Sequence, residues 1–372
     1  MSVQKNILRD PSQKAGSCRV DTERDFGADL VRIAAGLLVL TVHFFLRNGF
    51  YYSEAGDLWG ILACAVRIFS YSCVPLFMVL TGYLKCRKAW TPSYYLSLIP
   101  ILISYTVISL IHLIYKICYE GVRMTVFEWI EEFLSFQLAN YSWYVGMYVG
   151  LFLFSPLLNL IWSGCRTKKQ HAGVVLTMAA LTLLPPTVNG IANTGYELLP
   201  AYFTQIYYVA YYFIGCYIRT YRPKIRTGTG LAAAGALCIL MAVVNVITRT
   251  EPAGFYSGFS SGYGTLPTAA VTVFIFLSLC RISSKSPKIK KTAAFFSGLI
   301  FEVYLLSYLF DKHIYILHYK AYPMSLYLPV GILMVSAVFL LSCAAAIPVK
   351  KLSKTVYGRL LRRYETQKNR AG

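Results

Sequence analysis

A small set of ionisable side chains lies inside long apolar stretches of this 372-residue sequence, and these side chains are its strongest candidates for chemistry. Inserting one charged side chain at the centre of a membrane-spanning helix costs about 2.5–3.5 kcal/mol, so such residues are kept where they serve a purpose. The set consists of Asp29, Arg32, His43, Arg67, His112, Glu302, Asp311, Lys312 and His313. Histidine suits proton transfer and arginine suits the binding of anionic groups.

Arg32 and His43 form the most informative pair. Their separation of eleven residues equals three helical turns plus about 20°, so both side chains lie on one helix face about 16.5 Å apart. His43 lies about 10 Å from the end of its stretch, and Arg67 lies about 13 Å from the start of the next, so the two share a similar depth. An imidazole kept uncharged beside a guanidinium can act as a general base. A histidine that is hydrogen-bonded inside a helix bundle for structural reasons would give the same sequence pattern. Asp29, three residues before Arg32, is explained by a local ion pair with Arg32.

The elements that must hold these residues follow from the composition. Hydrophobic residues make up 56% of the chain and charged residues 14%, against about 25% charged in soluble domains. This excludes a water-soluble enzyme, a disordered tail and a nucleic-acid binder. Ten apolar stretches of 18 to 27 residues are long enough to cross a hydrocarbon core of about 30 Å as helices. They are residues 28–50, 58–84, 93–118, 141–163, 171–189, 197–219, 229–248, 264–281, 295–318 and 325–349. Because backbone polar groups must be paired within lipid, and barrel-like alternation is missing, we predict an all-α polytopic membrane protein with about ten transmembrane helices.

The excess of basic residues predicts the orientation of these helices. The formal net charge is +20, and 28 of the 36 Lys and Arg residues fall on alternate connecting segments, 1–27, 85–92, 164–170, 219–228, 281–294 and 350–372. The positive-inside rule therefore places both termini in the cytoplasm, with the first helix as an uncleaved membrane-entry signal. We expect a cytoplasmic N-terminal segment at 1–27, a membrane domain at 28–349 and a basic cytoplasmic tail at 350–372. The charge thus reports topology in the cell membrane rather than a nucleic-acid partner.

Other motifs carry little chemistry. Gly258-Phe-Ser-Ser-Gly262 matches the nucleophile-elbow pattern, but that pattern needs a strand before it and a helix after it, so we interpret the match as a coincidence. Apolar residues at helical spacing within 119–140 predict an amphipathic helix at the interface, and the Gly- and Ser-rich loop 249–263 is either a lid or a turn. No two of the ten cysteines share an outer loop, so we expect neither a disulfide framework nor a metal site.

Several segments, taken in order, resemble the acyltransferase 3 family of integral-membrane O-acyltransferases. The run from Arg32 to His43 resembles the family's Arg-x10-His helix, and the run from Pro75 to Tyr83 is similar to the Phe-x-x-Ser-Gly-Phe/Tyr end of its second helix. The basic run Lys85, Arg87 and Lys88 follows, and the segments Trp143-Tyr144, Tyr211–Gly215 and Ser297–Leu306 also fit. The resemblance covers residues 25 to 345 and implies ten helices. Tyr141 and Ser307 depart from it, because they stand where many members have histidine.

The resemblance implies transfer of an acyl group, usually acetyl, from a cytoplasmic acyl-CoA donor such as acetyl-CoA to a hydroxyl of a cell-surface or lipid-linked carbohydrate, without a metal. His43 is then the base that takes the hydroxyl proton, and Arg67 is the cation nearest the developing oxyanion. Arg32 is expected to line the entry of the donor, while Lys85, Arg87 and Lys88 bind its phosphates or serve only as orientation charges. The residues expected to line the substrate site are Tyr83, Trp143, Tyr144 and Glu302, although tyrosines of an interfacial belt show the same pattern.

A different class of function stays open at this point. Arg and His within the membrane also suit an exporter or flippase that moves a polysaccharide or a lipid-linked glycan precursor. A membrane sensor has less support, because the sequence shows no soluble input or output domain. We expect membrane lipid as a partner and no nucleic acid, and the sequence predicts no particular oligomeric state.

Overall fold

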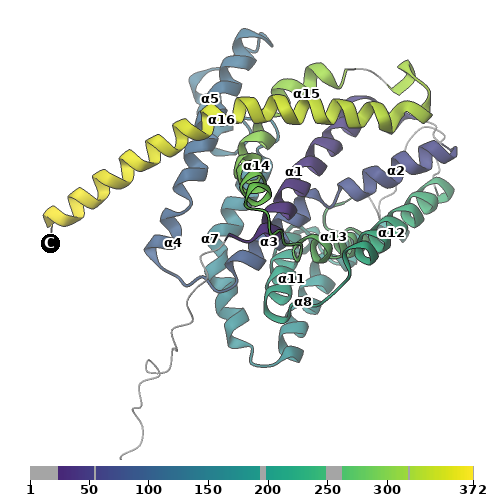
Figure 1. The fold of residues 1–372 in the computed structure, drawn as a ribbon, viewed down its shortest axis with the longest axis horizontal. Coiled ribbons are helices and arrows are strands. Elements are labelled where there is room, and N and C mark those ends of the chain that lie inside the picture. The colour runs from purple at the N-terminus through teal and green to yellow at the C-terminus, as the bar shows by residue number, and fades with distance from the viewer. Residues whose placement is uncertain (1–23, 54–55, 193–197, 249–261, 317–318, 372) are drawn as a thin grey trace, which may run out of the picture.

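The computed structural model describes residues 24–53, 56–192, 198–248, 262–316 and 319–371, which form helices and turns and no strand (Figure 1). The predicted all-α class is therefore confirmed for this part of the chain. The longer helices are α1 (Phe26–Arg47), α2 (Leu58–Ser70), α3 (Cys73–Lys85), α5 (Ile99–Cys118), α7 (Trp143–Gly164), α8 (Lys168–Thr182), α11 (Tyr207–Tyr221), α12 (Thr227–Thr248), α13 (Leu266–Leu279), α14 (Pro287–Leu306) and α16 (Met324–Ala371). The shorter ones are η2 (Phe50–Tyr52), α4 (Pro92–Leu96), α6 (Val126–Leu134), α9 (Leu184–Ala192), α10 (Ala201–Gln205), α15 (Tyr308–Ile314) and η4 (Tyr319–Ala321).

Within the described residues, seven helical segments are long and apolar enough to cross a membrane, or eight if one bent pair counts as a single span. They are Phe26–Arg47, Leu58–Lys85, Pro92–Cys118, Trp143–Gly164, Lys168–Gly190, Thr227–Ile247, Met324–Arg362, and the pair of α14 and α15, which is bent by 65°. Each of them overlaps a predicted apolar stretch. The two other predicted stretches contain α11, of 15 residues, and α13, of 14 residues, which are short for a full crossing. The structure is that of a multi-pass membrane protein, and it does not confirm the count of ten.

The helix ends that the charge pattern assigns to the same side of the membrane contact one another. At one end, which we call the basic end, the Arg24 guanidinium donates to the Ala294 carbonyl of α14 (3.0 Å), and the Thr227 hydroxyl of α12 donates to the Ser278 carbonyl of α13 (3.1 Å). The opposite end is held by similar contacts, Asn48 with Tyr327, Tyr115 with His313 and Glu120 with Lys312. This grouping agrees with the sides that the charge pattern predicts for the ends of α1, α5, α12, α13 and α16.

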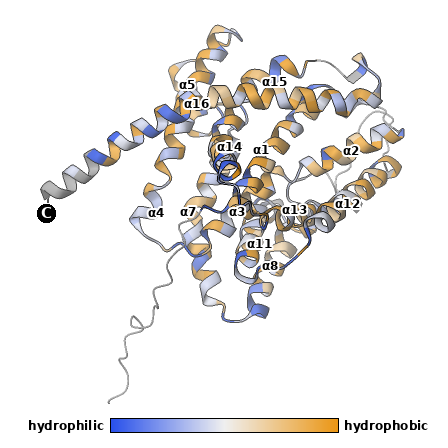
Figure 2. Cartoon of the chain, in the orientation of Figure 1, coloured by the Kyte–Doolittle hydropathy of each residue, from blue (hydrophilic) through white to orange (hydrophobic). Residues whose placement is uncertain are grey.

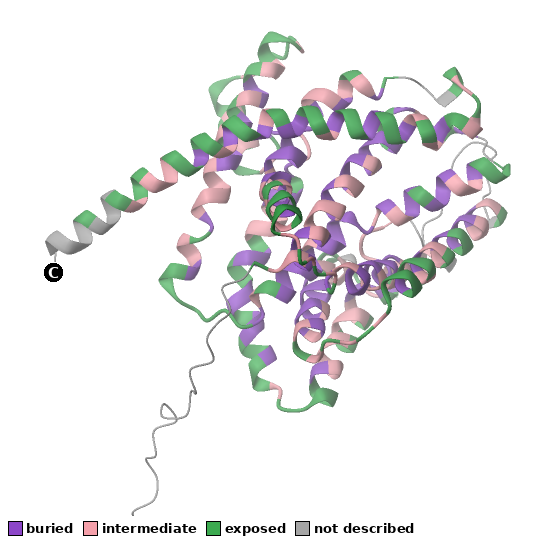
Figure 3. Cartoon of the chain, in the orientation of Figure 1, coloured by how far each residue is buried: buried purple, intermediate pink, exposed green. Residues whose placement is uncertain are grey.

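Two glycines, one in α3 and one in α11, let the backbones of these two helices come into direct contact. A Cβ atom added at Gly82 would lie 2.0 Å from the Tyr212 carbonyl oxygen, and one at Gly215 would lie 2.0 Å from the Val79 carbonyl oxygen. Small residues allow such close approach between membrane helices. Most of α3 and one face of α1 are buried in the centre of the bundle (Figure 3). The side chains that lie between these two helices therefore face the protein interior and not lipid.

The last helix, α16, continues without interruption across the predicted domain boundary at 349/350. It is 48 residues long, runs along the bundle and projects beyond it at its C-terminal end (Figure 1). Its first half is mostly hydrophobic and its projecting half carries the hydrophilic residues of the predicted tail (Figure 2). The predicted tail therefore begins within a helix rather than at a break in structure.

Within residues 119–140 the predicted amphipathic helix is α6. Thr125 and Glu128 form a capping box at its start, with reciprocal hydrogen bonds between side chain and backbone. Phe127 is 75% exposed, so the apolar face points away from the bundle as an interfacial helix requires. Residues 249–261, which include most of the second predicted loop and the start of the nucleophile-elbow pattern, lie outside the described residues.

Candidate active site

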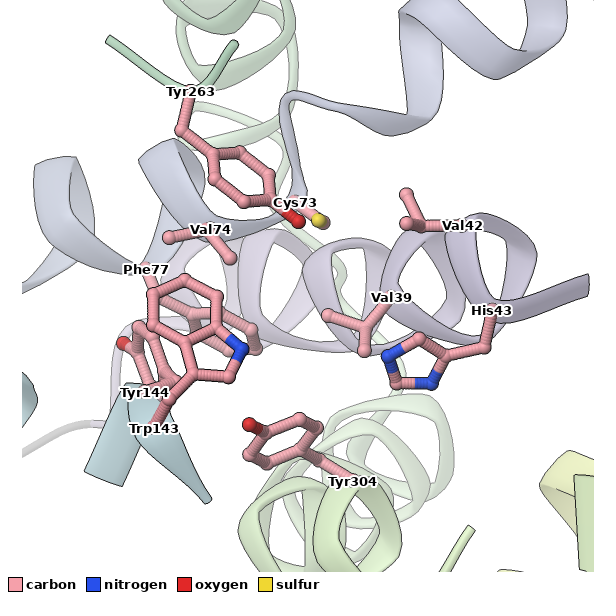
Figure 4. A pocket seen from close by; sticks show the side chains of 10 residues that line it. All are labelled: Val39, Val42, His43, Cys73, Val74, Phe77, Trp143, Tyr144, Tyr263 and Tyr304. Atoms are coloured by element: carbon pink, nitrogen blue, oxygen red, sulfur yellow. The ribbon is translucent and has the colours of Figure 1, made fainter. Parts of the chain in front are cut away.

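His43 projects from α1 into a small cavity of about 30 Å³ (Figure 4). The cavity is lined by Val39, Val42, His43, Cys73, Val74, Phe77, Trp143, Tyr144, Tyr263 and Tyr304. One imidazole nitrogen points into this space, and the indole N–H of Trp143 faces it from the other side (Figure 4). A base and a hydrogen-bond donor thus meet across a space lined mainly by apolar and aromatic groups.

The aromatic lining of this cavity comes from the start of α7, the residues just before α13 and the end of α14. Trp143 and Tyr144 open α7, and their rings meet edge to face at 6.2 Å. Tyr263, just before α13, stacks on Trp143 at 5.8 Å, and Tyr304 of α14 meets Tyr144 edge to face at 6.0 Å. Aromatic pairs in these geometries stabilise one another beyond their buried area, which holds the lining in one arrangement.

Behind His43 lies a polar cluster formed by Arg47, Tyr141 and Asp311. The ring of Tyr141 stacks on the imidazole with 3.6 Å between centroids and 22° between planes. The Tyr141 hydroxyl accepts hydrogen bonds from Arg47 Nε (3.1 Å) and Nη2 (2.9 Å) and donates to Asp311 Oδ2 (2.9 Å). His43 Nδ1 lies 3.7 Å from the same Oδ2. The Asp311 carboxylate is completely buried, so its charge is balanced inside the bundle by Arg47, 3.6 Å away.

Lys312, the residue after Asp311, holds the short helix α15 in place. Lys312 Nζ donates to Glu120 Oε1 at 2.6 Å, and the Tyr308 hydroxyl donates to the same oxygen at 2.9 Å. Burial opposes ionisation of Glu120, but these two donors outweigh it and hold the pKa of Glu120 below its ordinary value. The bent end of the α14–α15 pair is thus tied to the segment after α5.

A second, larger cavity of about 360 Å³ lies toward the basic end. Its polar lining includes Arg32, Lys85, Ser104, Ser297, Glu302 and Lys350, and its apolar lining includes Leu80, Leu84, Pro100, Ile101, Ile300 and Phe301. Arg32 Nη1 donates to Ser297 Oγ (2.7 Å) and lies 3.3 Å from Asp29 Oδ1. Arg24 also pairs with Asp29, at 2.7 Å, so the Asp29 carboxylate fixes two guanidinium groups between the start of α1 and α14.

The buried Glu302 and the half-exposed Lys350 face each other in this larger cavity. Lys350 Nζ lies 2.9 Å from Glu302 Oε1, which also accepts from Ser104 Oγ at 2.8 Å. The pair joins α14, α16 and α5 around the space. Sequence reasoning assigned Lys350 to the tail, because a cation just after an apolar stretch looks like an orientation charge.

Three aromatic residues, Phe77, Tyr144 and Tyr304, line both cavities and form the wall between them. Tyr304 also donates a hydrogen bond to the backbone carbonyl of Tyr141. The one face of α1 that carries Arg32 and His43 therefore presents the guanidinium to the large cavity and the imidazole to the small one.

Arg67 lies apart from this arrangement. Its guanidinium is buried between the rings of Tyr51 and Tyr71, 4.6 and 4.8 Å from their centroids, and donates to both hydroxyls at 2.9 and 3.2 Å. Arg67 is not among the described residues that line either cavity. Among the described residues, Tyr71 links Arg67 to the small cavity, because its ring lies 5.3 Å from that of Tyr263. The similar depth predicted for Arg67 and His43 in their two helices does not place both side chains at one cavity.

The basic run after α3 is divided between two environments. Lys85 lines the large cavity with its ammonium 3.9 Å from the Phe152 ring, whereas Arg87 and Lys88 are exposed at the surface of the basic end. The carbonyls of Lys85 and Lys88 both accept from Asn159 Nδ2 at 2.8 Å, which fixes this turn against α7. Tyr83 is buried next to the turn, under the Arg219 guanidinium (4.9 Å).

Three residues of the small site were missed or only partly identified from sequence. Arg47 follows His43 by one helical turn, a spacing that places both on one face, so it could have been found. Asp311 was identified as an ionisable residue in an apolar stretch, but its partner Tyr141 is 170 positions away. Tyr263 lies in a Gly- and Ser-rich loop with no pattern that predicts its contact with Trp143.

No group of three or more His, Cys, Asp or Glu side chains in the described part of the chain is arranged to hold a metal ion. The model of a family described as an acyltransferase domain matches residues 25–348. No curated protein and no solved structure matches the chain.

Proposed function

From the premise that the chain belongs to the acyltransferase 3 family, which its match over residues 25–348 shows, we propose that this membrane acyltransferase is an O-acyltransferase that uses acyl-CoA. The acyl group is a short one, acetyl by preference. The acceptor is a hydroxyl of a cell-surface or lipid-linked carbohydrate, and the basic end faces the cytoplasm of the cell that carries the protein in its membrane.

The observation that carries the proposal is the pair of cavities on one face of α1. A large cavity with the cations Arg32, Lys85 and Lys350 lies toward the basic end, and a small cavity with His43 lies beyond one aromatic wall. An anionic donor that enters from the basic end and an acceptor hydroxyl beside an imidazole are the two reactants that such a pair suits.

The chemistry at His43 is general base catalysis. The imidazole takes the proton from the acceptor hydroxyl as the oxygen attacks the thioester carbonyl carbon. The C–S bond of the resulting tetrahedral intermediate breaks, the imidazolium returns the proton to the leaving thiolate, and free coenzyme A departs. The indole N–H of Trp143, which faces the cavity, is placed to donate to an oxygen of the reacting groups (Figure 4).

The donor is held by the basic end and by the large cavity. Phosphates of coenzyme A meet the exposed cations Arg87 and Lys88, and the narrower arm of the donor enters past Arg32 and Lys85. Glu302, already bonded to Lys350 and Ser104, shapes the polar side of this space.

The acceptor side is aromatic. Trp143 and Tyr144 line the small cavity, and Trp143 is also exposed, so the apolar C–H face of a sugar packs on the exposed ring of Trp143 while only the acceptor hydroxyl enters the small cavity. Tyr83 lies outside both cavity linings and is buried next to the turn that carries Lys85. For Arg67 the contacts favour a positioning role, in which it holds Tyr71 against Tyr263 of the cavity wall.

Comparison of cells with and without the gene tests the proposal. Mass spectrometry of surface and lipid-linked glycans should show the same polymers at similar abundance, with acyl groups missing when the gene is deleted and restored when it is re-expressed. Loss of the polymer itself, with acylation unaffected on what remains, would instead identify an exporter or flippase and contradict the proposal.

A further inference from the structure

Tyr141 has a backbone conformation that tyrosine seldom adopts. Its φ is +69°, in the left-handed region, and it is followed at once by Ser142 and α7. Residues in sparsely populated regions of φ and ψ cost of order 1–3 kcal/mol and persist where the surroundings fix them. Here the Tyr304 hydroxyl donates to the Tyr141 carbonyl oxygen, which anchors the backbone to the wall between the cavities.

The unusual backbone turns the side chain of Tyr141 toward His43. The ring lies flat on the imidazole, 3.6 Å between centroids, which fixes the plane of the base. The hydroxyl is used in both directions, since it accepts from Arg47 and donates to Asp311 Oδ2. The ring of Tyr141 thus constrains His43, and its hydroxyl constrains Arg47 and Asp311.

Two further buried polar atoms of the cluster lack hydrogen-bond partners among the described residues. His43 Nδ1 and Asp311 Oδ1 are both buried without one, and Nδ1 faces Asp311 Oδ2 at 3.7 Å. A separation slightly beyond hydrogen-bond length is common before substrate binds and shortens in the reacting complex. Nδ1 faces the carboxylate, and the other ring nitrogen is the one directed into the cavity (Figure 4).

We infer that Asp311 and Tyr141 are positioning residues for His43. Asp311 accepts the Nδ1–H of the imidazole, which leaves Nε2 free as the base, and its charge stabilises the imidazolium formed during transfer. Tyr141 holds the carboxylate with its hydroxyl and the imidazole with its ring. The inference rests on the proposed function, because it assigns these residues to the same reaction.

The charged and titratable groups around His43 come from every element packed against it. They are Arg47 of α1, Cys73 of α3, Tyr141, Tyr144 of α7, Tyr263, Tyr304 of α14, and Tyr308, Asp311 and Tyr315 in or next to α15. Asp311 supplies the anion of this set and Arg47 the cation. Removing the carboxylate therefore leaves an imidazolium beside Arg47 with no opposing charge.

The test is the pH profile of kcat for the full-length protein in detergent, with acetyl-CoA at saturation and glycan-bearing membranes from the deletion strain as acceptor. Asp311→Asn should lower kcat by about 10²–10⁴-fold with the KM for acetyl-CoA unchanged. The acid limb of its profile should move to lower pH by about 1–3 units, because an anion within about 4–6 Å favours the protonated imidazole in the wild type. Tyr141→Phe keeps the ring and should lower kcat about tenfold.

Tyr217→Phe is the matched control, since Tyr217 lies in α11 outside both cavity linings and should keep the wild-type profile. Melting temperatures are measured for every variant, and if Asp311→Asn does not fold, Tyr141→Phe decides alone. A wild-type kcat and acid limb in the folded variants would overturn the inference while leaving the proposed function intact, provided that His43→Ala is inactive. Full activity of His43→Ala would remove His43 as the base, whereas absence of acyl transfer by the wild-type protein would remove the proposed function itself.

Discussion

At the scale of single residues, Arg32 is the side chain whose position is explained most completely. It stands on the face of α1 that also carries His43, and Ser297 and Asp29 hold its guanidinium at the edge of the large cavity. Asp29 was interpreted from sequence as a local ion-pair partner, and the structure adds Arg24 and Ser297 to that pair. A face shared by Arg32 and His43 follows from helical spacing alone, whereas the contact of Arg32 with Ser297 on α14 does not.

Replacement of Arg32 by alanine should weaken donor binding without unfolding the protein, because Asp29 keeps its ion pair with Arg24. Loss of a charge-assisted hydrogen bond to the donor, worth about 1.5–3 kcal/mol, should raise the KM for acetyl-CoA by about 10–100-fold. Steady-state kinetics over a range of acetyl-CoA concentrations measures this. Lys169→Ala, an exposed cation of α8 outside both cavity linings, is the control, and an unchanged KM in Arg32→Ala would remove Arg32 from the donor site.

At the scale of helices, the contact of α3 with α11 positions the site. Gly215 stood out in sequence only as part of a resemblance, and the structure gives it a physical reason, because any side chain there meets the Val79 carbonyl. α3 in turn carries Cys73, Val74 and Phe77, which line the small cavity. The packing of α3 therefore determines the shape of that space.

Gly215→Ala should destabilise the bundle by about 1–3 kcal/mol, the usual cost of overpacking. Its melting temperature in detergent should fall, and activity should fall with it as α3 shifts. Gly235→Ala is the matched control, because a Cβ added at Gly235 of α12 meets no atom within 4 Å. Equal melting temperatures for the two variants would show that α3 and α11 do not pack as described.

Helix positions could be read from the sequence because burial in lipid or in the bundle needs long apolar runs, and each predicted stretch contains helix. The 65° bend between α14 and α15 could not, because hydropathy reports composition and not direction. Its consequence is large, since the bend brings Asp311 next to His43. The wall of Phe77, Tyr144 and Tyr304 was equally hidden, as it joins three helices that are distant in the chain.

At the scale of the whole molecule, the described helices form a bundle with a large cavity toward the basic end and a small cavity at His43, and both are lined by Phe77, Tyr144 and Tyr304. The space next to His43 has a volume of about 30 Å³, enough for about two water-sized groups at 10–15 Å³ each. Together with the proposed function, this small volume leads us to propose that Phe77, Tyr144 and Tyr304 limit the length of the acyl group that reaches His43.

Phe77→Ala should join the two cavities and relax this limit. The ratio of kcat/KM for butyryl-CoA to that for acetyl-CoA should rise by at least about tenfold, since each methylene that a pocket accepts is worth about 1–3 kcal/mol. Competition between the two donors, read by mass spectrometry of the acylated glycan, measures the ratio. Phe154→Ala, an exposed phenylalanine of α7 outside both cavity linings, should leave it unchanged. No change in Phe77→Ala would show that the acyl chain is not held at this wall.

The most direct test of the central claim, that His43 is the base of an acyl transfer, is a single transfer assay. Purified full-length protein is incubated with radiolabelled acetyl-CoA and with glycan-bearing membranes from the deletion strain, and label in the glycan is counted. His43→Ala should be folded and transfer at least about 10²–10⁴-fold more slowly than wild type, whereas His313→Ala, an exposed histidine outside both cavity linings, should transfer normally. Wild-type transfer by folded His43→Ala would contradict the account.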